Sequence, residues 1–220
     1  MPFSFLSVEV SANDGSPHQV QLYTDVSGEW LAQSDQSFEW QTSTNASTVQ
    51  HQFSLQNQTQ FTEVGGRLRY GSVIYATQQV VCFREILIIG VFLKTFQVSG
   101  MTYQVADAAI VRPQFQTTGV LNNTVDTEFR VIGDRWPIFA FAHDLGVVGT
   151  SGTTPVVYTI GYVRNPLVQL SNIPNVNSVR PPYYLIRHDS ASELVCPLCT
   201  PFATVVICPF IGRCPSQRLP

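Results

Sequence analysis

Charged side chains are scarce in this chain. Lys, Arg, Asp and Glu make up 12% of its 220 residues, about half the share that is usual in soluble domains. The 12 basic residues are outnumbered by 15 acidic ones, so the net charge is -3. Proteins that bind nucleic acid or anionic lipid need a basic patch. The sequence has no basic run, and we expect neither nucleic acid nor a membrane as a partner.

Long apolar runs and cofactor motifs are also missing. A membrane-spanning helix needs roughly 20 apolar residues, whereas the longest apolar segment, Glu85 to Gln97, is shorter and contains Lys94. The first ten residues lack the basic and apolar regions of a secretory signal. No glycine-rich phosphate loop, Gly-x-Ser-x-Gly elbow or His-Glu-x-x-His motif occurs, and these motifs bind nucleotides or build hydrolase sites. We expect no cofactor.

The chain contains many short segments in which apolar and polar residues alternate. This period of two is typical of half-buried strands, and Gly, Asn and Pro separate the segments. No segment shows a helical period of 3.6. The spacing predicts an all-β fold, an antiparallel β-sandwich over residues 1–186, followed by a short irregular tail at 187–220. The predicted strands include Phe3–Val10, His18–Asp25, Gln50–Leu55, Thr59–Val64, Ser72–Gln78 and Met101–Val105.

Three segments depart from this pattern. Val80 to Gln97 is nearly continuous apolar sequence, which predicts either a central strand pair buried on both faces or a segment foreign to the domain, such as a translated intron. Asn172 to Pro182 is expected to be a linker because its prolines fix the backbone and remove donors. The tail carries four of the five cysteines, whose spacing fits a zinc ribbon poorly and leaves disulfides or an unselected tail open. We expect no metal, and the weak candidate ligands are Cys196, Cys199, Cys208 and Cys214.

The stretch from Phe129 to Gly161 combines two strand-like runs with a polar cluster, and it predicts a hairpin at the heart of the domain. The cluster consists of Asp134, Arg135, His143 and Asp144. A histidine beside a carboxylate can bind a ligand or transfer protons. The alternative is structural, with Asp134 capping a turn and His143 hydrogen-bonded. His143 and Asp144 can share a site only if the strand ends there in a turn, because adjacent strand residues face opposite ways.

Aromatic residues provide a second set of candidates. The tryptophans Trp30, Trp40 and Trp136 form either a platform for sugars or part of the core. Asp25 lies near Trp30, an arrangement that fits glycoside chemistry as well as a turn. Three Asn-x-Ser/Thr acceptors for glycans, at Asn45, Asn57 and Asn122, together with the low charge favour a secreted protein.

Four segments resemble the N-terminal β-domain of the fungal glutaminase A-like family. They are VEVSANDGSPHQVQLYTDVSGEW (Val8–Trp30), QTQFTEVGGRLRYGSVIYAT (Gln58–Thr77), DTEFRVIGDRWPIFAFAHDLG (Asp126–Gly146) and TPVVYTIGYVRNP (Thr154–Pro166). The resemblance covers most of residues 4–186. It implies a secreted, amidohydrolase-type protein in which a β-sandwich precedes a helical domain that holds the active site. It also implies further sequence before Met1, where a signal would lie.

The chain has no helical half, so the resemblance implies a non-catalytic domain that supports a missing helical catalytic domain. Its apolar Val81–Gln97 segment and its end from Ser190 to Pro220 differ from the family pattern, which suggests a truncated or mis-spliced product that cannot be assigned glutaminase activity. One alternative is a free-standing, lectin-like module that binds glycans. Another is a hydrolase in its own right that depends on Asp144.

Overall fold

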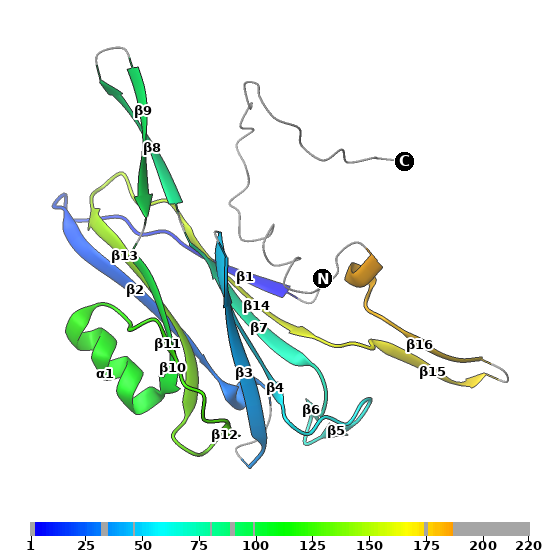
Figure 1. Cartoon of the computed structure of the whole chain (residues 1–220). Coiled ribbons are helices and arrows are strands. Elements are labelled where there is room, and N and C mark those ends of the chain that lie inside the picture. The colour runs from blue at the N-terminus through cyan, green and yellow to red at the C-terminus, as the bar shows by residue number, and fades with distance from the viewer. Residues whose placement is uncertain are drawn as a thin grey trace, which may run out of the picture.

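Two β-sheets packed face to face form the body of the protein (Figure 1). The computed structural model describes residues 3–31, 35–45, 47–79, 81–88, 91–98, 100–173 and 176–186. The larger sheet has the strand order β1 (Phe3–Val8), β14 (Val156–Val163), β7 (Ser72–Gln78), β4 (Thr48–Leu55), β3 (Ser37–Thr44) and β12 (Arg130–Val131). The smaller sheet has the order β11 (Thr124–Val125), β10 (Gly100–Asp107), β13 (Pro137–Val148) and β2 (His18–Ser27). Apart from the short parallel pair β10 and β11, neighbouring strands in these two sheets run antiparallel. The predicted all-β, antiparallel sandwich is confirmed.

Alternate residues of each strand form the core between the sheets. On β4 the side chains of Val49, Phe53 and Leu55 are buried there, and β13 contributes Phe139 and Phe141. The rings of Phe53 and Phe139 are stacked with their centroids 4.1 Å apart, so they join the two sheets directly. Burial of one such side chain stabilises the folded state by roughly 1.5–3 kcal/mol.

A helix, α1 (Ala108–Thr118), covers the outer face of the smaller sheet (Figure 1). The sequence did not predict it, because Pro113 and a polar second half hide the helical period. Its ends nevertheless carry standard signals. Asp107 accepts a hydrogen bond from the N–H of Ala109 at the start, and Gly119, with a φ of 71°, ends the helix in the left-handed conformation.

The predicted hairpin between Phe129 and Gly161 is wrong. Its two strands, β13 and β14, belong to different sheets, and β13 pairs with β10 and β2 instead. The reason is that β13 is buried on both faces. Phe139 and Phe141 point into the core between the sheets, while Ala140 and Ala142 lie under α1. A strand covered on both sides takes a central place with a neighbour on each edge.

Smaller strand pairs surround the sandwich. Within the described part of the chain, β8 (Val81–Ile88) and β9 (Val91–Val98) pair only with each other, so the expected strand pair exists but is not central. β15 (Val168–Ile173) and β16 (Val176–Arg180) form another pair, so much of the predicted linker is β-structure. The pair β5 (Glu63–Val64) and β6 (Arg67–Leu68) and the short helices η1 (Gly28–Trp30) and η2 (Tyr183–Ile186) are the remaining elements of the described residues. The cysteine-rich tail lies outside the described residues.

Candidate functional site

The structure does not bring His143 and Asp144 into one site. The strand β13 continues past them to Val148, with a bulge between Asp144 and Gly146 in place of the expected turn. The ring of His143 is fully buried between the sheets, and its Nδ1 lies 3.0 Å from the Tyr158 hydroxyl. The Asp144 carboxylate lies near the surface, where it accepts hydrogen bonds from the Gln19 side chain and the Gly146 N–H.

A second buried histidine, His51, lies in the same core. Its ring stacks on that of Phe141 at a centroid distance of 4.6 Å, and its Nδ1 is 2.8 Å from the Thr42 hydroxyl. Burial lowers the pKa of His51 from 6.5 to about 3 and that of His143 to about 4. Both rings are therefore neutral at ordinary pH, and their role is to fill and hydrogen-bond the core. Nothing in the sequence singles out His51 except its place at an inward position of β4.

Asp134 and Arg135 lie at the opposite end of β13 from Asp144. The part of β13 between these two residues and His143 is roughly 20 Å long. Arg135 adopts a φ of 47° and donates two parallel hydrogen bonds to the Glu128 carboxylate, of 2.9 and 2.8 Å. Its guanidinium also contacts Asp134 and holds the pKa of both carboxyls below their usual values. The predicted cluster is thus two separate groups of residues.

The loop at residues 126–136 is organised around Arg130, whose side chain is only 5% exposed. Its guanidinium donates to the Asp126 carboxylate and to the main-chain oxygens of Glu128, Asp134 and Arg135. It also lies over the Trp40 ring, 5.6 Å from the centroid. One side chain therefore satisfies four acceptors and fixes the shape of the loop.

This fixed loop presents exposed aromatic residues at one end of the sandwich. Trp136 is 42% exposed and Phe129 is 44% exposed. Trp30, which is 59% exposed, follows the end of β2 at the same end of the β2–β13 pair, because Ser27 pairs with Ile138. Trp40, in contrast, is buried, so the core interpretation is confirmed for Trp40 and wrong for Trp30 and Trp136. We call Trp30, Phe129, Arg135 and Trp136 the loop-end surface.

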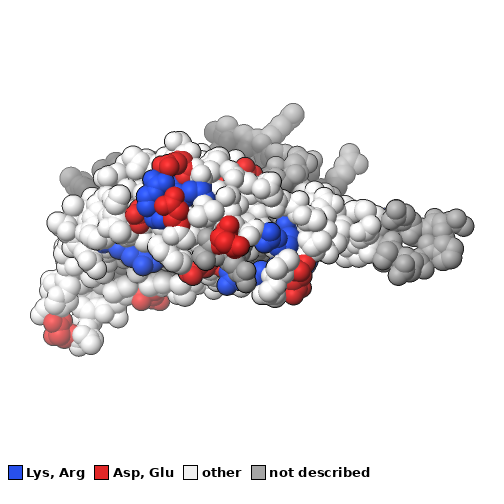
Figure 2. Space-filling view, turned by 90° about the horizontal axis from the view of Figure 1, so that it is seen from below, with Lys and Arg blue, Asp and Glu red and all other residues white. Residues whose placement is uncertain are grey.

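Charges on this end of the molecule are few and of mixed sign. Seen from below, the charged side chains lie in small groups, some of mixed sign and some of one sign, on a surface that is mostly uncharged (Figure 2). Arg135 is paired with both Glu128 and Asp134. Because these charges largely compensate one another, the loop-end surface attracts neither anions nor cations strongly from a distance.

Asp25 does not lie in a site with Trp30. Its carboxylate accepts two hydrogen bonds from Arg112 of α1, of 2.8 and 3.0 Å, and a third from the Tyr23 hydroxyl. This bidentate pair ties the helix to the outer face of the smaller sheet. It also raises the pKa of Tyr23, chiefly through burial and then through the bond to Asp25.

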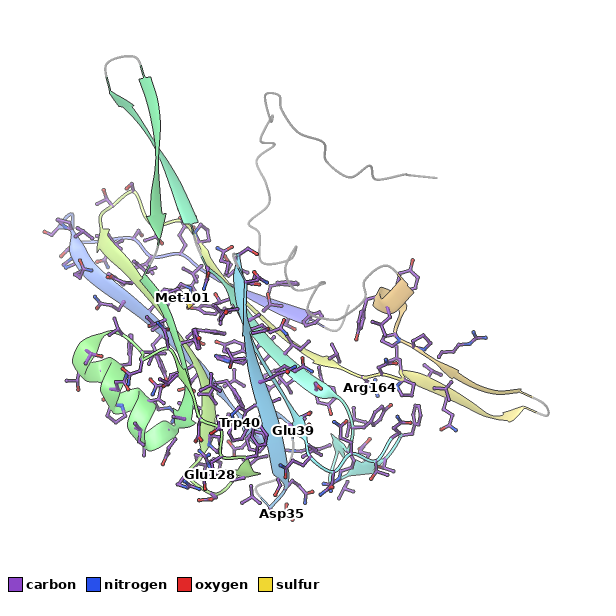
Figure 3. The ribbon with its side chains drawn as sticks, in the orientation of Figure 1. Asp35, Glu39, Trp40, Met101, Glu128 and Arg164 are labelled. Atoms are coloured by element: carbon purple, nitrogen blue, oxygen red, sulfur yellow. The ribbon has the colours of Figure 1, made fainter. Side chains whose placement is uncertain are left out.

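A shallow groove of 320 Å³ lies beside the loop-end surface on the outer face of the larger sheet. The side chains that border it come from β3, β4 and the 126–136 loop, and Figure 3 labels three residues of this region, Glu39, Trp40 and Glu128. No feature of the sequence predicts this groove, because Phe129 is far along the chain from β3 and β4. It is lined by Glu39, Trp40, Gln41, Gln52, Ser54 and Phe129.

The remaining predicted sites are modification and metal positions. Asn45, Asn57 and Asn122 are all exposed. Among the described residues there is no group of three or more His, Cys, Asp or Glu placed to hold a metal ion, and no helix in that part of the chain is long and apolar enough to cross a membrane.

Comparison with known proteins places the domain in a family. Residues 1–205 match the model of a family described as "Domain of unknown function (DUF5127)". The chain belongs to this family. The chain is 30% identical to glutaminase A of Aspergillus oryzae over 181 residues, which cover 81% of the chain and 23% of that protein. It is 24% identical to a probable glutaminase of Arthroderma benhamiae over 195 residues, which cover 82% of the chain and 20% of that protein. No solved structure matches.

These matches confirm the resemblance to the glutaminase A-like family. The chain is a glutaminase-like protein domain. It spans less than a quarter of the length of both curated relatives, so most of each relative lies outside the region that this domain matches.

Proposed function

We propose that this domain is the non-catalytic β-sandwich of a secreted glutaminase-like amidohydrolase, where it packs against a helical catalytic domain and supports it. The observation that carries the proposal is the loop-end surface. Trp and Arg are the residue types that contribute most to binding at protein interfaces, and here Trp30, Trp136 and Arg135 are exposed together at one end of the fold.

The rigidity of the loop supports the same role. Binding costs less when the contacting side chains are already ordered in the free protein. Arg130 holds the backbone between Asp126 and Arg135 through four acceptors, so Phe129 and Trp136 project from a fixed frame. Compensated charges around them lower the cost of burying this surface, because Arg135 already has its carboxylate partners.

The placement of the polar residues supports a non-catalytic role. A catalytic base needs a position within hydrogen-bond reach of a substrate, but His143 is enclosed in the core and Asp134 lies at the far end of β13 from Asp144. Asp25 is engaged by Arg112. Each of these groups has a structural partner that accounts for its presence.

Secretion is part of the proposal and rests on the three exposed glycan acceptors, Asn45, Asn57 and Asn122. The Asn45 carboxamide oxygen already accepts hydrogen bonds from the backbone N–H groups of Ser47 and Thr48, so its side chain is held at the tip of the β3–β4 turn. Such a position is accessible to a bulky, solubilising modification.

Ammonia release from L-glutamine tests the non-catalytic role. The purified chain is expected to release none above the rate of a heat-denatured sample, and Asp144→Asn is expected to change nothing. Release that is proportional to the concentration of the chain and that disappears in Asp144→Asn would overturn the proposal and make this domain a hydrolase.

A further inference from the structure

The groove on the larger sheet has the features of a ligand site, and Phe129 is the one lining residue that it shares with the loop-end surface. Its volume of 320 Å³ lies at the lower end of the roughly 300–1,000 Å³ found for small-molecule sites. Its floor is formed by two pairs of directly opposed residues on β3 and β4, Glu39 with Ser54 and Gln41 with Gln52. These four side chains alternate with core residues and therefore face away from the core.

The floor is polar and held in place by its own contacts. The Gln41 side-chain amide donates to the carboxamide oxygen of Gln52 at 3.2 Å, and the Ser54 hydroxyl lies 3.5 Å from a Glu39 oxygen. A carboxamide has two N–H donors and a carbonyl acceptor. This single contact therefore leaves the Gln41 oxygen and an N–H group of Gln52 available to a ligand. Donors and acceptors then lie side by side on a flat strand surface.

An aromatic wall stands beside this floor. Phe129 is 44% exposed, and its ring meets that of Trp40 edge to face at a centroid distance of 4.9 Å. The Trp40 ring is fixed in turn, because its Nε1 donates to the Asp126 main-chain oxygen at 2.6 Å and Arg130 lies over it. Phe129 therefore offers an apolar ring on a rigid support.

The chemistry of this lining selects the class of ligand. The groove contains one carboxylate, from Glu39, and no basic side chain among its lining residues, which disfavours anionic ligands. Amides, a hydroxyl and a carboxylate match the hydroxyl groups of a sugar, each of which donates and accepts, and an aromatic face matches the apolar C–H face of a sugar ring. We infer that the groove lined by Glu39, Gln41, Gln52, Ser54 and Phe129 binds a neutral saccharide.

This site differs from the sugar platform expected from the sequence. Trp30 and Trp136 do not line the groove, and Asp25 lies on the other sheet under α1. The inference shares Phe129 with the loop-end surface but concerns a different ligand, a saccharide that the chain binds alone. Gln41 lies outside the loop-end surface, so Gln41→Ala tests the groove separately from the proposed support of a helical domain.

The test uses the full chain and a panel of neutral oligosaccharides of glucose, mannose, galactose and N-acetylglucosamine. A glycan array identifies the best ligand, and isothermal titration calorimetry then measures its Kd. Phe129→Ala and Gln41→Ala change exposed side chains of the groove. Phe5→Ala is the matched control, because Phe5 is 46% exposed and lies on β1 at the opposite edge of the same sheet. Circular dichroism checks that each variant is folded.

The expected result is binding of at least one neutral saccharide, weakened roughly tenfold by Phe129→Ala, as for the loss of an aromatic contact. Gln41→Ala is expected to weaken it too, and Phe5→Ala to leave it unchanged. Three results would overturn the inference: no binding of any panel member at millimolar concentration, binding unaffected by both groove variants, or an equal loss in Phe5→Ala.

Discussion

Acidification is expected to destabilise the domain through His51 and His143, the two histidines that lie between the sheets. Burial lowers the pKa of these rings to about 3 and about 4, respectively, whereas an unfolded histidine has a pKa of about 6.5. Between these values the unfolded chain binds protons that the folded chain does not. The stability that the neutral rings provide is therefore complete above about pH 6.5 and is lost as the pH falls towards the folded pKa values.

The size of the effect follows from the same shifts. Near pH 5 each unfolded histidine is protonated and each folded ring is neutral, so unfolding takes up close to two protons. The free energy of unfolding is then expected to change by about 2.7 kcal/mol per pH unit. From about pH 7 to about pH 5 the loss is about 2 kcal/mol for each histidine and roughly 4 kcal/mol for both.

Urea denaturation followed by tryptophan fluorescence measures this dependence between about pH 7 and about pH 5. Asp14, Glu128 and Asp134 also have lowered pKa values, and since carboxyls titrate lower in the pH scale they contribute mainly below this window. His143→Gln is expected to reduce the slope by about half, to roughly 1.4 kcal/mol per pH unit. Phe5→Ala, at an exposed and uncharged position on β1, provides the control variant.

A free energy of unfolding that stays constant over this range would refute the role of the two histidines. That role would equally be refuted if His143→Gln gave the same slope as the wild-type chain. The slope is the readout, so a general loss of stability in a variant does not affect the interpretation.

Three further changes test other parts of the structure. Arg130→Ala leaves the Asp126 carboxylate and three main-chain oxygens without their donor and is expected to lower the free energy of unfolding by about 3 kcal/mol. Arg112→Ala is expected to cost less, because the Arg112 side chain is 53% exposed and its partner Asp25 keeps the hydrogen bond from Tyr23. Equal losses in urea denaturation would contradict the role of Arg130. Gly71→Ala places a Cβ 2.7 Å from the Val163 main-chain oxygen at a φ of 113°, and its melting temperature is expected to fall well below that of Gly15→Ala, which has positive φ but open space. When the chain is produced in a secretory host, treatment with an amidase that removes N-linked glycans is expected to lower its apparent mass. Each of Asn45→Gln, Asn57→Gln and Asn122→Gln is expected to lack one glycan and to show a correspondingly smaller decrease. An unchanged mass would contradict secretion through a glycosylating pathway.

Several strands of the sandwich could be predicted from the sequence because their side chains alternate. Ser72 to Gln78 matches β7 residue for residue, and His18 to Asp25 lies within β2. The pairing of β13 could not be predicted, because β13 has apolar residues on both faces. Its sequence pattern therefore does not show which face points into the core between the sheets. The helix α1 was missed since only its Val111 is fully buried, so its apolar stripe is too narrow to produce a clear period.

Less of the candidate site than of the fold could be predicted from the sequence. His143 and Asp144 are adjacent in the sequence, but they lie on a continuous strand. The His143 side chain therefore points into the core and the Asp144 side chain lies at the surface. The role of Arg130 depends on four acceptors that only the folded loop brings together. The groove depends on β3 and β4 being neighbours and on Phe129 crossing their edge, which are properties of the tertiary structure.

Docking in trans tests the proposed role most directly. The portion of Aspergillus oryzae glutaminase A outside the region that this chain matches is produced alone, and its melting temperature is measured with and without the chain. The relative's own matched region serves as the positive control. At a free concentration of the chain about one hundred times its Kd, binding stabilises the partner by about 2.7 kcal/mol.

The account predicts that the chain raises the melting temperature of this portion. The double variant Trp30→Ser and Trp136→Ser is expected to abolish the increase. Val147→Ser, at a 70% exposed position near the other end of β13, is expected to retain it. An increase with the positive control but none with this chain, or an increase that survives in the double variant, would contradict the claim that the loop-end surface packs against a catalytic partner.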